Sequence, residues 1–219
     1  MIDIEREKRA AAEAAAALVE DGMTVGLGTG STVHYLLPPI AARRIRIRCV
    51  ATSPRTELEA RSLGIDVGPF ERLDRRLDIA LDGADQIAPD GWLIKGGGAA
   101  HTREKIVAAA ADRFVVIASS DKIVDRLSSP VPLELLEYGL QMTLRALAPT
   151  TLRGASRSPD GGVIADFQGE IGNPAALAAR FAATPGVVEH GLFEPTLVAD
   201  ILIAREGAIE HRRLTGAPS

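Results

Sequence analysis

The chain of 219 residues lacks several features that mark particular classes of protein. Its single cysteine, Cys49, excludes a framework of disulfide bonds and is typical of a reducing compartment. No uninterrupted apolar run reaches the ~18 residues that a membrane-spanning helix needs. The formal net charge of −4 provides no basic excess that would attract nucleic acid, and residues 3–9 are too strongly charged for a signal peptide. We therefore expect a cytoplasmic protein that binds neither nucleic acid nor membranes.

What the chain does contain is a regular alternation of short apolar runs and helical patterns over its first half. The apolar runs predict strands at residues 23–27, 45–51, 77–81, 92–94 and 114–118. Helices are predicted around and between them, at residues 4–20, 33–43, 54–63 and 103–111. Such an alternation is typical of an α/β fold with a doubly wound, mostly parallel, Rossmann-like sheet.

The pattern changes after about residue 127, where strands and helices follow an α+β order. We predict helices near residues 135–147 and 174–183, a hairpin from 150–155 and 162–167, and short strands at 187–188 and 192–193. The buried run 198–204 is predicted to return to the first domain. The predicted domains are therefore a Rossmann-like one from residues 1–129 and 198–219, and a small α+β one from residues 130–197.

Polar segments follow most of the predicted strands of the first domain. In open α/β sheets, ligands bind beyond the carboxyl ends of the strands. We therefore expect these segments to converge on one rim of the sheet, although they lie far apart in the sequence: GTGST (28–32), DGAD (82–85), KGGG (95–98) and SSDK (119–122).

The segment GTGST has the composition of a phosphate-binding loop. Gly28 and Gly30 expose backbone N–H groups, Ser31 and Thr32 add hydroxyl donors, and a predicted helix begins there. The segment matches neither the Walker pattern nor a dinucleotide fingerprint. An ordinary strand-to-helix turn with a Ser or Thr cap is the alternative, and the residues alone leave both interpretations open.

Asp82 and Asp85 lie three residues apart, with Gly83 and Ala84 between them. Two carboxylates at a strand end can bind sugar hydroxyls and shuttle protons, or can bind Mg²⁺. An Asx turn with a helix cap is the structural alternative. We expect no metal, because no cluster of histidine and cysteine is present and nearby lysines would supply the positive charge.

The segment Lys95-Gly96-Gly97-Gly98 leads into a predicted helix that carries Glu104. Consecutive glycines let the backbone approach a ligand closely, and the helix N-terminus favours an anion. With Lys95 as a cation and Glu104 as a candidate base, the combination suits a small anionic substrate that must lose a proton. Glu104 alone would be read as a solvated glutamate. Lys8 and Lys122 could close on a phosphate, although exposure is the usual state of a lysine.

Five segments, in this order, resemble ribose-5-phosphate isomerase of the A type, and together they span nearly the whole chain: GLGTGST (26–32), LDGADQI (81–87), IKGGGAAHTREKIV (94–107), SSDKIVDRL (119–127) and TPGVVEHGLF (184–193). The resemblance implies interconversion of D-ribose 5-phosphate and D-ribulose 5-phosphate without metal or cofactor. It also implies a homodimer or homotetramer and a small domain of ferredoxin-like type.

By motif position, Glu104 resembles the family's catalytic base, and Asp82, Asp85 and Lys95 resemble its active-site polar groups. The positions that match substrate contacts are Lys8, Thr29, Gly30, Ser31, Thr32, Gly83, Ala84, Gly96, Gly97, Gly98 and Lys122. Gln86, His101 and His190 depart from the usual pattern, which has Glu, an apolar residue and Asn there. A non-catalytic sugar-phosphate sensor on the same scaffold is the alternative. An amino-sugar phosphate deaminase or a coenzyme A transferase is not favoured by these motifs.

Overall fold

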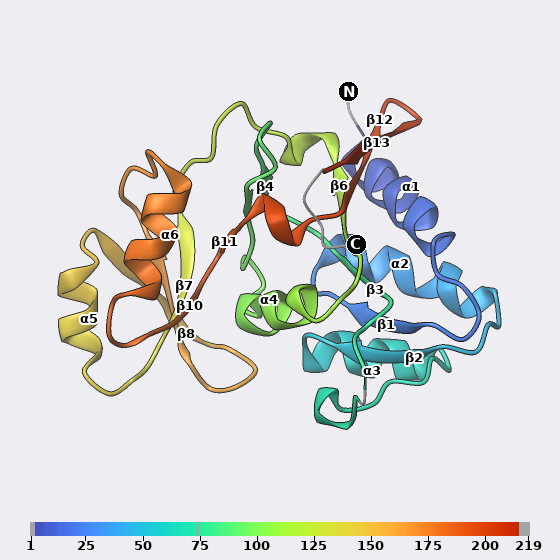
Figure 1. The fold of residues 1–219 in the computed structure, drawn as a ribbon, viewed down its shortest axis with the longest axis horizontal. Coiled ribbons are helices and arrows are strands. Elements are labelled where there is room, and N and C mark those ends of the chain that lie inside the picture. The colour runs from blue at the N-terminus through green and yellow to red at the C-terminus, as the bar shows by residue number, and fades with distance from the viewer. Residues whose placement is uncertain (1–2, 74, 215–219) are drawn as a thin grey trace. The chain divides into compact units, whose positions relative to one another are not determined.

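The computed structural model describes residues 3–73 and 75–214 (Figure 1). The described residues form two compact units, each built from several stretches of the chain. The first unit takes the described residues within Met1–Ala84, Arg103–Ile123 and Pro195–Ser219, and the second takes Asp85–Thr102 and Val124–Glu194. The boundaries near 124 and 194 lie close to the predicted ones, whereas Asp85–Thr102 groups with the second unit rather than the first.

The first unit is built on a six-stranded sheet with the order β13-β12-β6-β3-β1-β2. Neighbouring strands are parallel except for the hairpin of β12 and β13 at the edge. The strands are β1 (Thr24–Leu27), β2 (Arg48–Ala51), β3 (Ile79–Asp82), β6 (Phe114–Ser119), β12 (Asp200–Arg205) and β13 (Ala208–Arg213). The pairing of β12 with β6 confirms that the chain returns to this sheet after the second unit.

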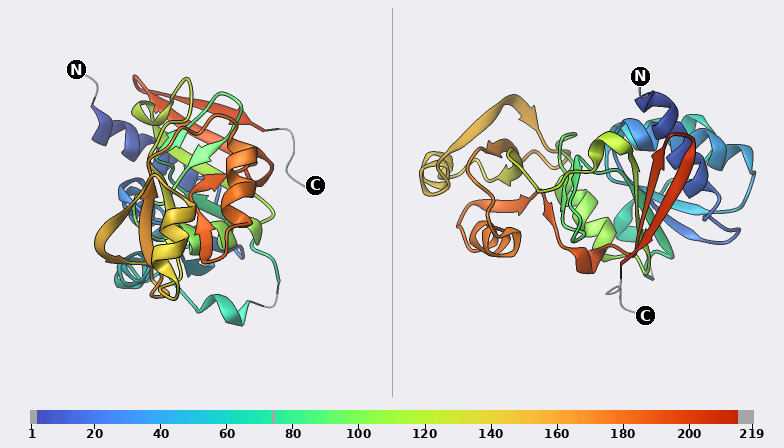
Figure 2. Two further views of the ribbon diagram at one scale, coloured as in Figure 1. Left: turned by 90° about the vertical axis from the view of Figure 1, so that its left-hand side faces the viewer. Right: turned by 90° about the horizontal axis from the view of Figure 1, so that it is seen from above.

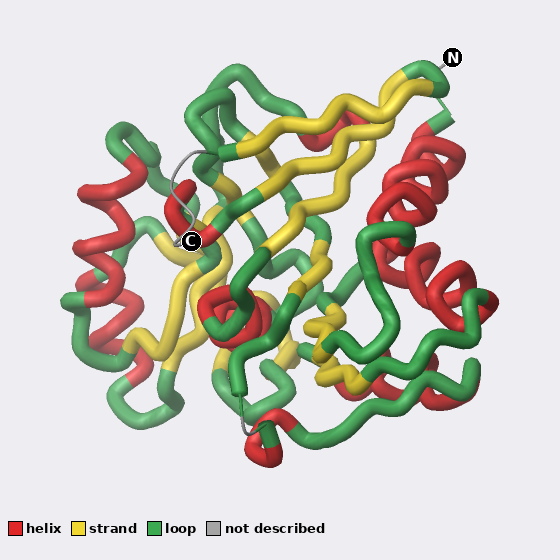
Figure 3. Tube along the Cα trace, turned by 45° about the vertical axis from the view of Figure 1, so that its right-hand side comes forward, coloured by secondary structure: helices red, strands yellow, loops and turns green. Residues whose placement is uncertain are grey.

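Helices cover both faces of this sheet. The helices α1 (Ile4–Ala16), α2 (Ser31–Ala42) and α3 (Pro54–Ser62) contribute to one apolar cluster with alternate residues of the central strands. Figure 3 shows α1, which begins at the N-terminal label, running alongside the strands. On the opposite face, a Cβ built on Gly26 of β1 would come within 2.5 Å of Val107 in α4 (His101–Ala109). The doubly wound α/β fold is therefore confirmed.

Local sequence explains where these helices begin and end. Asp3 caps α1 by accepting a hydrogen bond from the Arg6 N–H at 3.1 Å. Ser53 caps α3 in the same way, with Pro54 at the first helical position. Small buried alanines let α1 approach the sheet and α2 closely. Helix α1 ends at Ala16, before the predicted end at residue 20, and α2 begins at Ser31, before the predicted start at residue 33.

The second unit contains a four-stranded antiparallel sheet with the order β10-β7-β9-β8. Along the chain its elements are β7 (Val131–Leu135), α5 (Leu140–Ala146), β8 (Thr150–Arg157), β9 (Val163–Phe167), α6 (Pro174–Ala182) and β10 (Val187–His190). This β-α-β-β-α-β order is ferredoxin-like. Residues of α5 and α6 pack in one apolar cluster with the strands, and the two helices lie on one side of the sheet (Figure 2).

A small three-stranded sheet, in the order β11-β5-β4, completes the second unit. Its strands are β11 (Leu192–Phe193), β5 (Leu93–Ile94) and β4 (Gln86–Ile87). This pairing explains why Asp85–Thr102 groups with the second unit. Short 3₁₀ turns, η1 (Phe70–Arg72), η2 (Ser120–Lys122) and η3 (Pro195–Leu197), lie in the first unit.

One predicted helix was wrong over its first turn, and the strands β4 and β7 were not predicted. The stretch predicted as a helix at 135–147 begins with the end of β7, and α5 starts only after Gly139, whose φ of 73° is left-handed. The edge strand β13 was not predicted. Among the described residues, no helix combines the length and apolar composition of a membrane crossing.

Candidate active site

The carboxyl ends of β1 and β3 lie side by side at the rim of the first unit's sheet. Leu27 of β1 is the parallel partner of Leu81 of β3, and the Gly28 N–H donates to the Leu81 carbonyl at 2.9 Å. From β1 the chain crosses to β2 on one side, and afterwards to β3 on the other side. This reversal is the switch point at which open α/β sheets bind ligands. The segments GTGST and DGAD both begin there.

Asp82 organises the GTGST loop. Its side chain is buried, and Oδ1 accepts hydrogen bonds from the Thr29 N–H at 3.0 Å and from the Gly83 N–H at 2.7 Å. A Cβ atom on Gly28 would come within 1.9 Å of the Asp82 carboxyl carbon, so only glycine fits there. The Asp82 carboxylate therefore holds the loop in place, in addition to any catalytic role.

The neighbouring strand end fixes the loop from the other side. The Thr29 hydroxyl lies 2.7 Å from the Thr52 hydroxyl, and the Thr56 hydroxyl donates to the Gly28 carbonyl at 2.9 Å. The N-cap of α2 is Gly30, at φ 123°, rather than a serine or threonine. Ser31 and Thr32 form the first turn of α2, whose N–H groups point out of the helix end. This geometry suits an anion better than a capped turn.

The two candidate phosphate lysines stand in defined ion pairs. The Lys8 ammonium lies 2.7 Å from Glu5, whose other carboxyl oxygen accepts a hydrogen bond from Tyr35 of α2 at 2.7 Å. Lys8 is thereby held toward the first turns of α2. The ammonium of Lys122, the last residue of η2, lies 3.3 Å from Asp121, and the Ser119 hydroxyl donates to the same aspartate.

In the second unit, Asp85 holds the glycine segment. Its Oδ2 accepts a hydrogen bond from the Gly97 N–H at 2.8 Å, and a Cβ on Gly97 would come within 2.8 Å of Oδ1. Gly96 has a left-handed φ of 106°. Lys95 is buried, and its ammonium lies 5.5 Å from the centre of the Phe193 ring. Gly98, like Gly97 and Asp85, is exposed.

Arg153 was not predicted from the sequence as part of this region. Its Nη1 donates to the Gly96 carbonyl at 2.8 Å and to the Gly97 carbonyl at 3.1 Å, and its other nitrogens pair with Asp166. The guanidinium therefore holds the glycine segment from the side of β8. No local motif marks it, because its partners are backbone carbonyls more than fifty residues away.

Glu104 lies in the first turn of α4 and is only 3% exposed. Glu104 is therefore not a solvated surface glutamate. Burial of a carboxyl group near a helix N-terminus is a setting in which acid–base groups are found. Among the described residues, no group of three or more histidine, cysteine, aspartate or glutamate side chains is arranged to hold a metal ion.

A family model described as ribose 5-phosphate isomerase A (phosphoriboisomerase A) matches residues 48–208. The chain belongs to the ribose 5-phosphate isomerase A family. The protein of that name from Roseiflexus sp. (strain RS-1) is 46% identical over 222 residues, with 93% of this chain and 94% of that protein covered. The one from Natronomonas pharaonis is 44% identical, with 95% and 97% covered.

Solved structures agree with this family. Ribose 5 phosphate isomerase A from Neisseria gonorrhoeae matches with a TM-score of 0.92 and 30% identity, covering 98% of this chain and 99% of that one. A D-ribose-5-phosphate isomerase in complex with phospho-erythronic acid matches with a TM-score of 0.91 and 30% identity, covering 97% and 100%.

The three residues that the sequence resemblance marks as departures from the family's pattern all lie in the second unit. Gln86 binds Ser128 twice: its Nε2 donates to the Ser128 carbonyl at 2.8 Å, and its Oε1 accepts from the Ser128 N–H at 2.9 Å. His101 is fully buried, with a ring nitrogen 3.4 Å from the Glu189 carbonyl. His190 is also buried, with its ring 5.8 Å from that of Phe181.

Proposed function

We propose that this chain interconverts D-ribose 5-phosphate and D-ribulose 5-phosphate by proton transfer through an enediolate. Membership of the isomerase family over nearly the whole chain carries this proposal. A structural neighbour that binds phospho-erythronic acid, a phosphorylated sugar acid, supports a sugar-phosphate substrate. The family match does not favour the alternative of a non-catalytic sensor.

We assign the role of base to Glu104. Its carboxylate would remove the proton from C2 of the open-chain aldose, while the C1 carbonyl oxygen gains negative charge. The same proton would then return to C1, and the O2 hydroxyl would lose its proton to leave the C2 carbonyl. Burial favours this role, because a carboxylate removed from water is a stronger base than a solvated one.

Asp82, Asp85 and Lys95 are proposed to serve the oxygens of the substrate. Lys95 would stabilise the negative charge that develops on the carbonyl oxygen, an effect worth ~3 kcal/mol per well-placed donor. Asp82 or Asp85 would assist opening of the furanose ring and move the hydroxyl proton between O1 and O2. Gly83, Ala84 and the backbone of Gly96, Gly97 and Gly98 would contact the sugar.

The phosphate group is proposed to lie at the N-terminus of α2. The N–H groups and hydroxyls of Thr29, Gly30, Ser31 and Thr32 would donate hydrogen bonds to it. Lys8 and Lys122 would neutralise its charge. Holding the phosphate fixes the far end of the sugar, and this remote binding energy lowers the barrier at C1 and C2.

We further propose that the enzyme needs no cofactor or metal, that it forms a homodimer or homotetramer in the cytoplasm, and that it binds neither nucleic acid nor membranes. The family resemblance supports the oligomer and the lack of a cofactor or metal. The single cysteine supports the cytoplasm, the acidic net charge supports the lack of nucleic acid, and the lack of a long apolar run supports the lack of membrane binding. Residues 1–129 with 198–219 are proposed as the catalytic domain and 130–197 as the small domain. Light scattering of the purified protein tests the oligomeric state.

The decisive experiment measures formation of ribulose 5-phosphate from ribose 5-phosphate in EDTA by the wild type, Glu104→Gln and the surface control Glu13→Gln. We expect turnover by the wild type and the control. Glu104→Gln should bind substrate normally but lose about 10²- to 10⁴-fold in kcat, the usual contribution of a general base. Near-normal turnover of Glu104→Gln would remove Glu104 from this role. Absence of wild-type turnover would reject the proposed reaction.

A further inference from the structure

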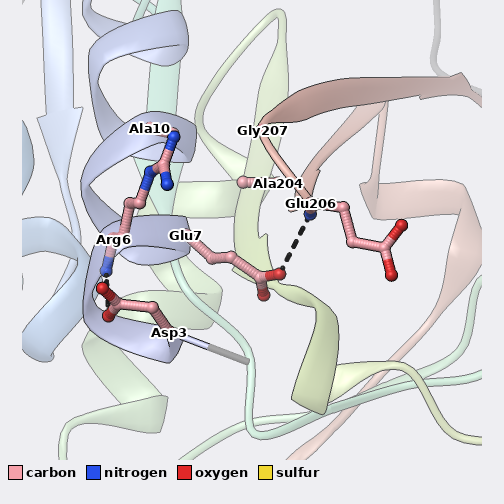
Figure 4. Close-up of a pocket in the computed structure, with 7 residues that line it drawn as sticks. All are labelled: Asp3, Arg6, Glu7, Ala10, Ala204, Glu206 and Gly207. Atoms are coloured by element: carbon pink, nitrogen blue, oxygen red, sulfur yellow. Dashed lines mark hydrogen bonds between the residues drawn. The ribbon is translucent and has the colours of Figure 1, made fainter. Parts of the chain in front are cut away.

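Glu7 joins three separate parts of the first unit. It lies on α1, is 6% exposed, and belongs to none of the sequence motifs described above. Its Oε2 accepts hydrogen bonds from the Ser120 N–H at 2.8 Å and the Ser120 hydroxyl at 2.6 Å. Its Oε1 accepts one from the Glu206 N–H at 3.3 Å, in the turn between β12 and β13 (Figure 4).

The contact with Ser120 acts as a cap supplied from another element. Ser120 begins η2, and the first N–H groups of a helical turn have no partner inside that turn. Such groups are usually satisfied by the side chain just before the turn. Here the acceptor is a carboxylate that lies 113 residues earlier in the chain. The position of η2 relative to α1 is therefore fixed by two short hydrogen bonds to one carboxylate.

Both candidate phosphate lysines lie close in the chain to the two residues that make this contact. Lys122 is the last residue of η2, two positions after Ser120. Lys8 follows Glu7 on α1 and is held toward α2 through Glu5 and Tyr35. Any shift of η2 away from α1 would change the distance between the two ammonium groups, and a phosphate bound by both would be held less well.

We propose that Glu7 is a positioning residue for the substrate's phosphate group: it fixes the turn that carries Lys122 against the helix that carries Lys8. This inference rests on the proposed function, since it assumes that the two lysines bind the phosphate. Glu7 itself does not touch the substrate, because its carboxylate oxygens face Ser120 and Glu206 and would repel an anion.

The chemistry of the site requires a carboxylate in particular. Burial by itself raises the pKa of Glu7, but the hydrogen bonds from Ser120 and Glu206 outweigh it, so the pKa lies below the ordinary value. The group is therefore ionised at neutral pH. An ionised carboxylate only accepts hydrogen bonds, and all three of its partners donate. A glutamine would present an N–H₂ group to at least one of these donors.

The test measures binding of inorganic phosphate by calorimetry, together with kcat and KM for ribose 5-phosphate. The variants are Glu7→Ala, Glu7→Gln, Lys122→Ala and the double variant, and Glu13→Ala is the matched control on the exposed side of α1. We expect Glu7→Ala to raise the phosphate Kd and KM about tenfold, the effect of losing a hydrogen-bonded charged partner. The change in kcat should stay within about threefold, and Glu7→Gln should fall between Glu7→Ala and the wild type.

The double variant separates positioning from general destabilisation. If Glu7 acts through Lys122, then adding Glu7→Ala to Lys122→Ala should leave the phosphate Kd unchanged. The proposal would be overturned if the double variant raised the phosphate Kd by the product of the two separate effects. It would also be overturned if the phosphate Kd of Glu7→Ala equalled that of Glu13→Ala. If Glu7→Ala does not fold, Ser120→Ala, which removes one of the three bonds, takes its place in the same comparison. Failure of the proposed reaction itself would appear separately, as lack of wild-type turnover with phosphate binding still measurable.

Discussion

The carboxylate of Asp82 occupies the space beside Gly28 in which any other residue would carry a side chain. A Cβ atom on Gly28 would come within 1.9 Å of the Asp82 carboxyl carbon and 2.0 Å of Oδ1. Gly28→Ala must therefore displace either Asp82 or the loop that its carboxylate holds through the Thr29 N–H. We expect kcat/KM for ribose 5-phosphate to fall at least ~100-fold, because a displacement of about an ångström at a catalytic group has that effect.

Gly68→Ala is the matched control. Gly68 is a loop glycine of the same unit, a Cβ atom added to it would meet nothing within 4 Å, and its φ is not left-handed. The kcat/KM of this variant should stay within about twofold of the wild type. Equal activities of the two alanine variants would show that the contact between Gly28 and Asp82 is not needed for turnover.

Asp85 offers a second test, in the second unit. Asp85→Ala removes the acceptor of the Gly97 N–H, whereas Asp85→Asn keeps an oxygen there but loses the charge. We expect kcat/KM to fall for both, by about tenfold or more, and further for alanine, because only alanine also releases the glycine segment. Steady-state kinetics with the exposed control Asp125→Ala checks this. Equal losses for alanine and asparagine would show that the charge alone matters.

Much of the sheet and of its rim was predictable from local sequence. Buried parallel strands appear as continuous apolar runs, as in Phe114–Ser119, where every residue is buried. Glycines and aspartates then follow such strands directly, which located Gly28–Thr32 and Asp82 at the same rim. The parallel pairing of β1 with β3 brings those two segments together, as the predicted alternation of strands and helices indicated.

The features that were not predicted depend mostly on contacts with residues far away in the chain. Strand β7 was missed because all of its residues are buried, so no alternation appears, and its Pro132 argues against a central strand. The leucine-rich residues that follow resemble a helix. Glu7 looks like Glu5 and Glu13 in the sequence, and its burial and its bonds from Ser120 and Glu206 distinguish it only in the structure. Arg153 is likewise defined by two distant carbonyls.

Gln86 stands where the sequence resemblance implies a glutamate, and its contacts predict the result of introducing that acid. Gln86→Glu would lose the bond from Nε2 to the Ser128 carbonyl and would place a carboxylate oxygen against that carbonyl. We expect the free energy of unfolding to fall by about 1 kcal/mol, with no gain in kcat. Urea denaturation and kinetics check this, and Gln168→Glu serves as an exposed control. A gain in kcat would mean that charge beside Asp85 governs the rate.

Asp200 predicts how stability depends on pH. It is buried on β12 and accepts hydrogen bonds from Arg113 Nε at 2.6 Å and from His211. Burial by itself raises its pKa, but these bonds outweigh it, so the pKa lies below the ordinary value of 3.8. The folded protein therefore keeps this carboxylate charged at pH values where the unfolded chain binds a proton. Its contribution to stability is complete above about pH 4 and is lost as the pH falls through the folded-state pKa.

Asp200→Asn should accordingly lower the free energy of unfolding by about 2 kcal/mol at pH 7, since it weakens a buried carboxylate's bonds to Arg113 and His211. The difference from the wild type should shrink as the pH falls below about 4, because protonation of Asp200 in the unfolded chain then removes the stability that its charge provides in the folded state. Urea denaturation at pH 7, 5 and 3.5 measures this. Asp21→Asn, which breaks a solvent-exposed pair with Arg46, should have a smaller effect at every pH. A difference for Asp200→Asn that stays constant down to pH 3.5 would mean that the second acceptor oxygen, rather than the charge, accounts for the loss of stability.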